Sequence, residues 1–419
     1  VSALMSGVMI KVALYGLIRV LFEWAAPAPL WAGLVMLGLG LLSALVGVLY
    51  ALSQQDLKRL LAFSSIENVG IVALGLGASI LFASQGERTW AAIAFAAALL
   101  HILNHAVFKA LLFLAAGAFE RAVGSLELDR IGGLLHRMPW TGGAFLIGSM
   151  AIAGVPPLNG FASEWLTLQA LIHVALDSSP GLGLAGALAT AGLAATAALA
   201  VFCFVKVVGL VLLGTPRRAE VEAAAEVPAG MWAAPVFLAG CCIVLGAVPG
   251  LLLPSLMKLA PQPQSLSAEP GVSIPGTGSL PSPWLLVGLL ALSGALWHLR
   301  GSRRTAPTPA WACGQRIEPS LSWSSAGITK PLRLVLESVL RPRREIEAVH
   351  ERGQLQSIRY RGEIPHLFDT LLYGPVQRGA LAGALVARRL QSGSVRAYAA
   401  YLLALLLVLL VAVRIGAIG

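Results

Sequence analysis

The sequence predicts an all-α membrane protein: a polytopic bundle of transmembrane helices, some of them discontinuous, with an amphipathic segment and a final transmembrane helix. Of the 419 residues, 57% are hydrophobic and only 12% are charged, about half the charged fraction of a soluble domain. The mean hydropathy is +0.79, and roughly ten apolar runs are long enough to cross a bilayer. This composition excludes a soluble enzyme.

The apolar runs follow one another along the chain. They comprise residues 1–22, 30–52, 57–83, 89–119, 139–155, 157–176, 181–213, 231–253, 284–299 and 397–417. Short polar turns separate the first eight, as expected for antiparallel helices in one bundle. We divide the chain into a helix bundle (1–258), a Pro/Ser/Gly linker (259–283), a transmembrane helix (284–299), a basic surface segment (300–395) and a C-terminal transmembrane helix (396–419).

The basic surface segment contains most of the net charge of +10. Residues 329–341 and 366–392 have helical patterns, and the second piece alternates apolar and basic positions. That pattern predicts an amphipathic helix lying along a membrane surface. Because no nucleic-acid readout motif accompanies these charges, we expect membrane lipids or an acidic partner subunit as partners, and no nucleic acid.

The four cysteines indicate no redox centre. They are Cys203, Cys241, Cys242 and Cys313, and none has CxxC spacing. Three lie in apolar runs, where a cysteine behaves as a small buried hydrophobe. We therefore expect no cofactor, no metal and no catalytic residue in this chain. Because the chain opens at Val1 inside an apolar run, without a basic leader, we also expect a fragment of a longer protein.

Seven ionisable residues in the apolar runs are candidates for a function inside the membrane. They are Lys11, Glu67, His101, His105, Lys109, Glu164 and Lys206. A Lys, Arg or Asp at the centre of a membrane helix costs about 2.5–3.5 kcal/mol. Together such residues rival a typical folding free energy of about 5–15 kcal/mol. A hydrated polar path through the bundle is the economical explanation.

The strongest pattern is the stripe His101, His105 and Lys109, with Asn104 as a candidate accessory residue. Residues spaced by four lie on one helix face, each about 6 Å above the last. Such a stripe must face a protein interior that holds water or partner charges. The alternative is a pair of satisfied core histidines and a lysine that reaches the membrane interface.

A second pattern is a predicted helix break. The breaking residues are Gly154, Pro156, Pro157 and Gly160. Prolines and glycines in this density cannot occupy an unbroken helix, so we expect a half-helix whose first turn presents Ser163 and Glu164. Discontinuous helices at membrane depth line cavities, and their termini often face ions. The alternative is an ordinary interhelical turn with Glu164 at the interface.

Three further charges allow two interpretations each. Lys11 could exchange protons reversibly, as buried lysines do, or reach a lipid headgroup. Glu67, about 15 Å into its span, could relay protons or hydrogen-bond a neighbouring helix. Lys206 lies seven or eight residues from the end of its run, where function and snorkelling are equally good explanations.

Two motifs, HAVFKALLFLAAGAF and GVPPLNGFASEWL, resemble the antiporter-like membrane subunits of respiratory complex I and of Mrp-type cation/proton antiporters. Shorter blocks resemble the group of hydrogenase-4 component B and formate hydrogenlyase subunit 3. These blocks are SIENVG at 65–70, WACGQ at 311–315 and GSVRAYAAY at 393–401. The resemblance covers essentially the whole chain.

The resemblance implies a proton-conducting subunit of a membrane-bound oxidoreductase. By this resemblance Lys11 matches a lysine on a broken helix, the stripe matches a central relay, and Glu164 matches an exit residue. Residues 366–392 match an amphipathic helix that extends along neighbouring subunits. Two features depart from the family: its partner glutamate would precede Val1, and residues 30–50 contain no Asp, Glu, Lys, Arg or His. We hypothesise that Glu67 supplies the missing polar link.

The sequence therefore predicts a proton-translocating subunit of an energy-converting hydrogenase or a complex-I-like oxidoreductase. Its expected partners are other membrane subunits and peripheral hydrogenase or dehydrogenase subunits, in the cytoplasmic membrane of a bacterium or archaeon. Two alternatives stay open. One is an Mrp-type Na⁺/H⁺ antiporter subunit with a carboxylate cage, and the other is a structural anchor that moves no ion.

Overall fold

The computed structural model describes most of the chain. The described residues are 1–176, 179–261, 272–274, 278–280, 282–300, 313–314, 323–336, 343–351, 354–363, 372–388, 391 and 393–415. They form two compact units, Val1–Pro331 and Leu332–Gly419. Each unit is described by itself below.

The first unit is a bundle of helices. Its elements are α1 (Ser2–Leu4), η1 (Met5–Met9), α2 (Ile10–Arg19), η2 (Val20–Trp24), α3 (Leu30–Ser53), α4 (Leu57–Gln85), α5 (Arg88–Val123), α6 (Leu134–Arg137), α7 (Pro139–Ile152), α8 (Asn159–Ala175), α9 (Pro180–Val211), α10 (Ala219–Glu222), α11 (Ala229–Ala247), η3 (Pro249–Leu251), α12 (Leu253–Met257), β1 (Val272–Ile274), β2 (Gly278–Leu280), α13 (Ser282–Arg300) and the start of α14 (Ser325–Val335).

The predicted all-α polytopic class is confirmed. Each of the ten predicted spans coincides with a helix, and eight helical segments of the described chain are long and apolar enough to cross a membrane. The other two spans are α7 and α8, with 14 and 17 residues. They are the two halves on either side of the predicted break. The protein is therefore a multi-pass membrane protein.

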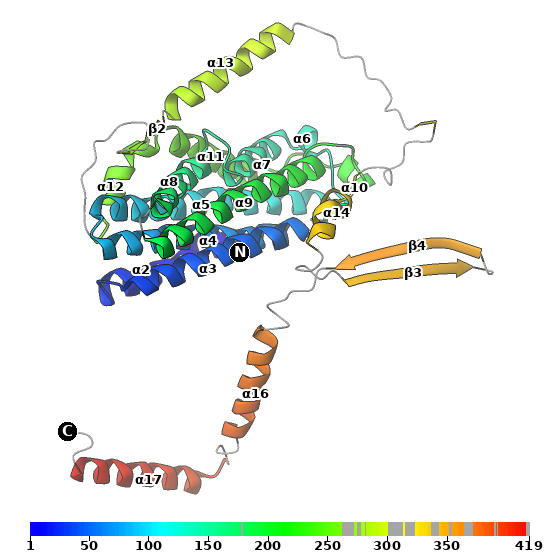
Figure 1. Ribbon diagram of the computed structural model, residues 1–419. Helices are drawn as coiled ribbons and strands as arrows, with labels where there is room; N and C mark the ends of the chain where they lie inside the picture. The colour runs from blue at the N-terminus through cyan, green and yellow to red at the C-terminus, as the bar shows by residue number, and fades with distance from the viewer. Residues whose placement is uncertain are drawn as a thin grey trace. The chain divides into compact units, whose positions relative to one another are not determined.

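Helices α4 and α5 form the centre of the bundle (Figure 1). Helix α3 packs along α4, helices α7, α8 and α11 pack on α5, and α9 contacts both α3 and α8. Glycines make the α3–α4 contact close, because small residues let membrane helices approach. A Cβ at Gly47 of α3 would collide with the backbone of Glu67 on α4. This contact fixes the position of Glu67 at the centre of the bundle.

The first span is not a regular α-helix. Met5–Met9 and Val20–Trp24 are π-helical, so their backbone hydrogen bonds run from residue i to i+5. Apolar periodicity cannot distinguish such wide turns from α-helix, and we did not predict them. Lys11 follows directly after the first of them, η1.

The second unit contains a hairpin and two helices. Strands β3 (Arg343–Glu351) and β4 (Gln354–Glu363) pair in antiparallel fashion, followed by α16 (Gly374–Arg388) and α17 (Val395–Arg414). Helix α17 coincides with the predicted C-terminal span. Helix α16 covers the centre of the predicted amphipathic segment 366–392, whose residues 366–371, 389–390 and 392 lie outside the described chain.

The two β-hairpins are additions to the predicted all-α class. Strands β1 and β2 pair within the predicted linker 259–283, and β3 and β4 pair within the basic segment. Of the predicted helical piece 329–341, the structure describes residues up to 336, and α14 ends at Val335. Outside the apolar spans, the helical pattern of the sequence predicted the secondary structure less well than it did inside them.

Candidate functional site

Lys109 lies at the centre of a buried hydrogen-bond network. Its side chain is fully buried on α5, and its ammonium group donates to the Leu61 carbonyl at 2.8 Å and to the Ser64 hydroxyl at 2.5 Å. Both acceptors belong to α4. The ammonium group is therefore held inside the bundle, against α4.

His101 connects three helices. Its Nδ1 lies 3.0 Å from the Ser163 hydroxyl on α8, and its Nε2 lies 3.2 Å from Asn68 Oδ1 on α4. The amide nitrogen of Asn68 in turn donates to the Ser64 carbonyl at 2.7 Å. Ser64 therefore links Lys109 and His101, which are two turns apart on α5. The predicted stripe is joined through α4.

His105 and Glu67 are buried and incompletely paired. The His105 ring lies parallel to that of His101, 6.4 Å away, and edge-on to Phe108. Its Nε2 and the Oε2 atom of Glu67 have no hydrogen-bond partner among the described residues. Because buried polar atoms are normally satisfied by protein or water, these two atoms mark positions suited to water.

The accessory residues belong to the same network. Asn104 Nδ2 donates to the Asn159 carbonyl at 2.7 Å and to the Ser163 hydroxyl at 3.0 Å. Asn159 is the first residue of α8, and Ser163 is one turn later. The stripe on α5 is therefore tied to the restart of the broken helix.

The predicted break is present between α7 and α8. Gly154 has a φ of +64°, a conformation that favours glycine. Gly160 faces the Ala151 carbonyl so closely that a Cβ would collide with it. Gly246 of α11 packs in the same way against the backbone of residues 157–159. The turn is thus formed by the positive φ of Gly154 and by two close backbone contacts.

Glu164 lies beside this turn. Its side chain is half-buried. Its Oε2 lies so close to Gly154 that a Cβ built on this glycine would be 2.7 Å from the oxygen. The carboxylate therefore faces the turn, while the neighbouring Ser163 faces His101. The two adjacent side chains thus face different neighbours, and both lie in the second turn of α8, which begins at Asn159.

Lys11 joins the network through serines. Its ammonium group donates to the Ser6 carbonyl at 2.5 Å, across the π-helical turn η1. The Ser6 and Ser65 hydroxyls are 2.6 Å apart, and Ser65 donates to the Leu61 carbonyl at 3.0 Å. That carbonyl also accepts from Lys109. Lys11 is half-buried, and it is the network's most exposed lysine.

Sequence reasoning missed the serines. Ser6, Ser64 and Ser65 are buried, yet we assigned them no role. Two adjacent serines inside an apolar run, one turn before Glu67, were the available indication. A further participant, the Leu61 carbonyl, is a backbone atom that no residue pattern reveals.

Lys206 lies apart from this network. It is buried on α9, and its ammonium group donates to the carbonyls of Leu52 and Gln54 at 2.6 and 3.0 Å. These carbonyls end α3. A cation at a helix C-terminus is stabilised by the unpaired carbonyls and by the helix dipole. The structure therefore places the Lys206 ammonium group at the C-terminal end of α3.

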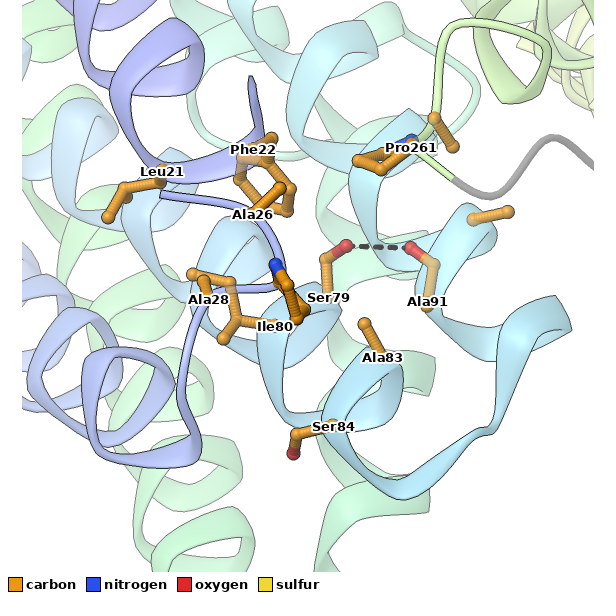
Figure 2. Close-up of a pocket in the computed structure, with 13 residues that line it drawn as sticks. Leu21, Phe22, Ala26, Ala28, Ser79, Ile80, Ala83, Ser84, Ala91 and Pro261 are labelled. Carbon is orange, nitrogen blue, oxygen red and sulfur yellow. Dashed lines mark hydrogen bonds between the residues drawn. The ribbon is translucent and has the colours of Figure 1, made fainter. Parts of the chain in front are cut away.

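One cavity of about 290 Å³ opens at another part of the bundle, between η2, the end of α4 and the start of α5. Its lining is mostly apolar, as Figure 2 shows for Leu21, Phe22 and Ile80. The Ser79 hydroxyl beside it donates to the Ala91 carbonyl at 2.8 Å. None of the ionisable residues discussed above lines this cavity.

Among the residues that the structure describes, no metal-binding cluster and no disulfide is found. These residues contain no group of three or more His, Cys, Asp or Glu side chains that could hold a metal ion. Cys203 and Cys242 are buried, Cys241 is half-buried and Cys313 is exposed, and all four are free thiols. The prediction that the chain binds no cofactor stays a prediction.

The region that contains this site matches a known family of membrane proteins. The family described as NADH:quinone oxidoreductase/Mrp antiporter, TM matches residues 1–190, which include the stripe and the broken helix. Hydrogenase-4 component B of Escherichia coli is 39% identical over 99% of this chain and 64% of its own length. An uncharacterised protein of Mycobacterium tuberculosis is 40% identical over 98% of this chain and 67% of its own length.

A solved structure has the same fold over nearly the whole chain. A chain of the membrane-bound sulfane sulfur reductase, an archaeal respiratory membrane complex, superimposes with a TM-score of 0.68 at 26% identity. The alignment covers 98% of this chain and 62% of that one. The chain thus spans about two thirds of the length of the relatives that it matches.

Proposed function

Because the chain belongs to the NADH:quinone oxidoreductase/Mrp antiporter family of membrane subunits, we propose that it carries protons across the membrane. It would do so as one subunit of an energy-converting hydrogenase or a complex-I-like oxidoreductase. Electrons would pass through partner subunits, and this chain would bind no cofactor. Its location would be the cytoplasmic membrane of a bacterium or archaeon.

The observation that carries this proposal is the series of hydrogen-bonded residues, linked through side chains and main-chain carbonyls, that runs from Lys11 to the restart of α8. Its members, in order, are Lys11, Ser6, Ser65, Leu61, Lys109, Ser64, Asn68, His101, Ser163 and Asn104. Proton transfer requires donors and acceptors within hydrogen-bond reach, directly or through one water. The network supplies that spacing through the centre of the bundle.

The members of the network have different roles in this proposal. Amines, imidazoles and hydroxyls can accept and release a proton, whereas the Asn68 amide and the main-chain carbonyls of Ser6, Leu61 and Ser64 can only orient their neighbours. Water would complete the path at these points. The unpaired atoms of His105 and Glu67 give such water further partners. Glu164, beside the helix break, is the proposed exit.

Coupling to electron transfer would be electrostatic. A charge that approaches a buried lysine changes the balance between its two protonation states. Lys109 has no carboxylate among its hydrogen-bond partners, although Glu67 is near enough to interact with it electrostatically. A charge change in a neighbouring subunit could therefore load or unload Lys109 with a proton.

The test uses inside-out membrane vesicles that contain the full-length subunit in its complex. A pH-sensitive dye reports proton uptake, and electron transfer is measured in parallel. Lys109→Met and Glu164→Gln should abolish proton uptake, while Lys258→Met, a change of an exposed lysine, should not affect it. If both relay variants assemble and pump normally, the chain is a structural anchor.

A Na⁺/H⁺ antiporter is the second candidate, because the matching family includes Mrp antiporters. The same vesicles distinguish it. Uptake of radioactive Na⁺ that depends on the proton gradient and is lost in Lys109→Met would favour the antiporter. Proton uptake that continues unchanged in Na⁺-free buffer favours the proton-pumping subunit.

A further inference from the structure

The end of α3 is a polar junction where distant parts of the first unit meet. We define the α3-end junction as Leu52, Gln54, Asp129, Arg217, Ser325 and Lys206. Lys206 reaches it from α9 through the carbonyls of Leu52 and Gln54. Ser325, at the start of α14, donates its hydroxyl to the same Gln54 carbonyl at 3.4 Å. One backbone atom thus accepts from two elements that are far apart in sequence.

An ion pair holds the start of α14 in this junction. The Ser325 backbone N–H donates to Asp129 Oδ1 at 2.5 Å. Arg217 lies 3.5 Å from that carboxylate oxygen and donates to the Trp323 carbonyl at 2.6 Å. The loop that carries Asp129 also pairs with the α3–α4 turn, since the Leu57 N–H donates to the Leu126 carbonyl.

The junction lies directly before the acceptors of Lys109. Helix α4 begins at Leu57, three residues after Gln54, and its Asp56 cap accepts from the Arg59 N–H at 2.9 Å. One turn into α4 is the Leu61 carbonyl, and Ser64 follows in the next turn. A helix transmits a displacement of its first turn along its axis, because its hydrogen-bonded turns are rigid.

We propose that Lys206 is a positioning residue for Lys109: by holding the end of α3, it sets where α4 presents the Leu61 carbonyl and the Ser64 hydroxyl. The inference rests on the proposed proton transfer through Lys109. A charged side chain in a membrane helix is expensive, and a hydroxyl could cap a helix end at lower cost. The ammonium group is suited to hold two carbonyls at once from α9, a helix that packs against α3.

Lys206→Met tests this proposal in the vesicle assay with the full-length subunit in its complex. We expect complex assembly and electron transfer to persist, while the number of protons moved per electron falls about tenfold, since misplacement by about 1 Å can cost such factors. Lys206→Arg keeps the charge and the donors and should restore most of the ratio. Lys258→Met is the matched control. A Lys206→Met ratio equal to that of the control overturns the proposal.

A double variant separates positioning from a general loss of stability. If Lys206 acts by placing the acceptors of Lys109, then Lys206→Met should cause a smaller fold loss in a Ser64→Ala background, where one of those acceptors is already gone, than in the unchanged protein. Equal fold losses in the two backgrounds overturn the proposal. Ser325→Ala, which removes one hydrogen bond to Gln54 and no charge, should give a smaller reduction with the same dependence on Ser64.

The proposed function and the positioning proposal fail in different ways. If Lys109→Met alone pumps normally, both are wrong. If Lys109→Met stops pumping while Lys206→Met pumps like the Lys258→Met control, only the positioning role of Lys206 is wrong.

Discussion

The ammonium group of Lys109 on α5 donates a 2.5 Å hydrogen bond to the hydroxyl of Ser64 on α4. Both residues are buried, and the bond joins the two central helices of the bundle. Ser64 also accepts from Asn68 through its carbonyl. It therefore connects Lys109, through Asn68, to His101 of the same stripe. Four predictions concern this network and the helices that hold it.

Ser64→Ala should slow proton translocation without preventing assembly. The substitution removes one of the two acceptors of a buried ammonium group, which costs about 1–3 kcal/mol. If that cost falls on the transfer step, the rate drops about tenfold or more. The measurement is proton uptake in vesicles. Ser84→Ala, at an exposed serine of the same helix, is the matched control, and equal rates for the two variants would contradict this role of Ser64.

Asn68→Leu should destabilise the bundle. The leucine has a similar shape but leaves His101 Nε2 without its acceptor, and a buried polar group without a partner costs about 1–3 kcal/mol. The free energy of unfolding in detergent is the quantity to measure. A double-mutant cycle with His101→Phe isolates the pair, and we expect a coupling energy of about 0.5–3 kcal/mol. Additive effects would mean that the two side chains do not interact.

Gly154→Ala should impair both stability and transport. A positive φ costs an alanine about 1–2 kcal/mol, and the new Cβ would also press on the Glu164 carboxylate. Gly86 has a φ of +83° with open space around the position of a Cβ. Gly86→Ala therefore reproduces the backbone strain alone. Thermal unfolding should change in both variants, whereas proton uptake should fall only in Gly154→Ala.

Glu226→Ala should loosen the first half of the broken helix. The Glu226 carboxylate accepts from the backbone N–H groups of Trp140 and Thr141 and from the Thr141 hydroxyl, all at the start of α7. Loss of such a cap costs about 0.5–2 kcal/mol. Unfolding in detergent measures it, with the exposed Glu222→Ala as control. Equal stability of the two variants would show that α7 does not depend on this cap.

The sequence located the membrane helices well because apolar runs of this length have few other structures available. It also identified the break between α7 and α8, since Pro156 and Pro157 cannot continue a helix. The π-helical turn η1 could not be predicted, because it changes the backbone hydrogen bonds and not the apolar pattern. The two hairpins were missed because short strands outside a core carry weak periodicity.

The candidate site was predicted less completely than the fold. Spacing alone placed His101, His105 and Lys109 on one face, and the structure joins that face to α4 and α8. The connections depend on Ser64, Ser65 and Asn68, whose contacts arise only from the packing of helices. Lys206 shows the same limit, because its acceptors on α3 are about 150 residues away in sequence.

The meeting point of the two lysine branches is the main-chain oxygen of Leu61, which accepts from Lys109 and from Ser65. No change of side chain deletes that atom. An alanine scan of the subunit would therefore detect a loss of proton transport at both lysines, but it would not detect the role of the Leu61 oxygen between them. Only a substitution of the backbone itself, such as an ester in place of the Leu61–Ala62 amide, would weaken this acceptor directly.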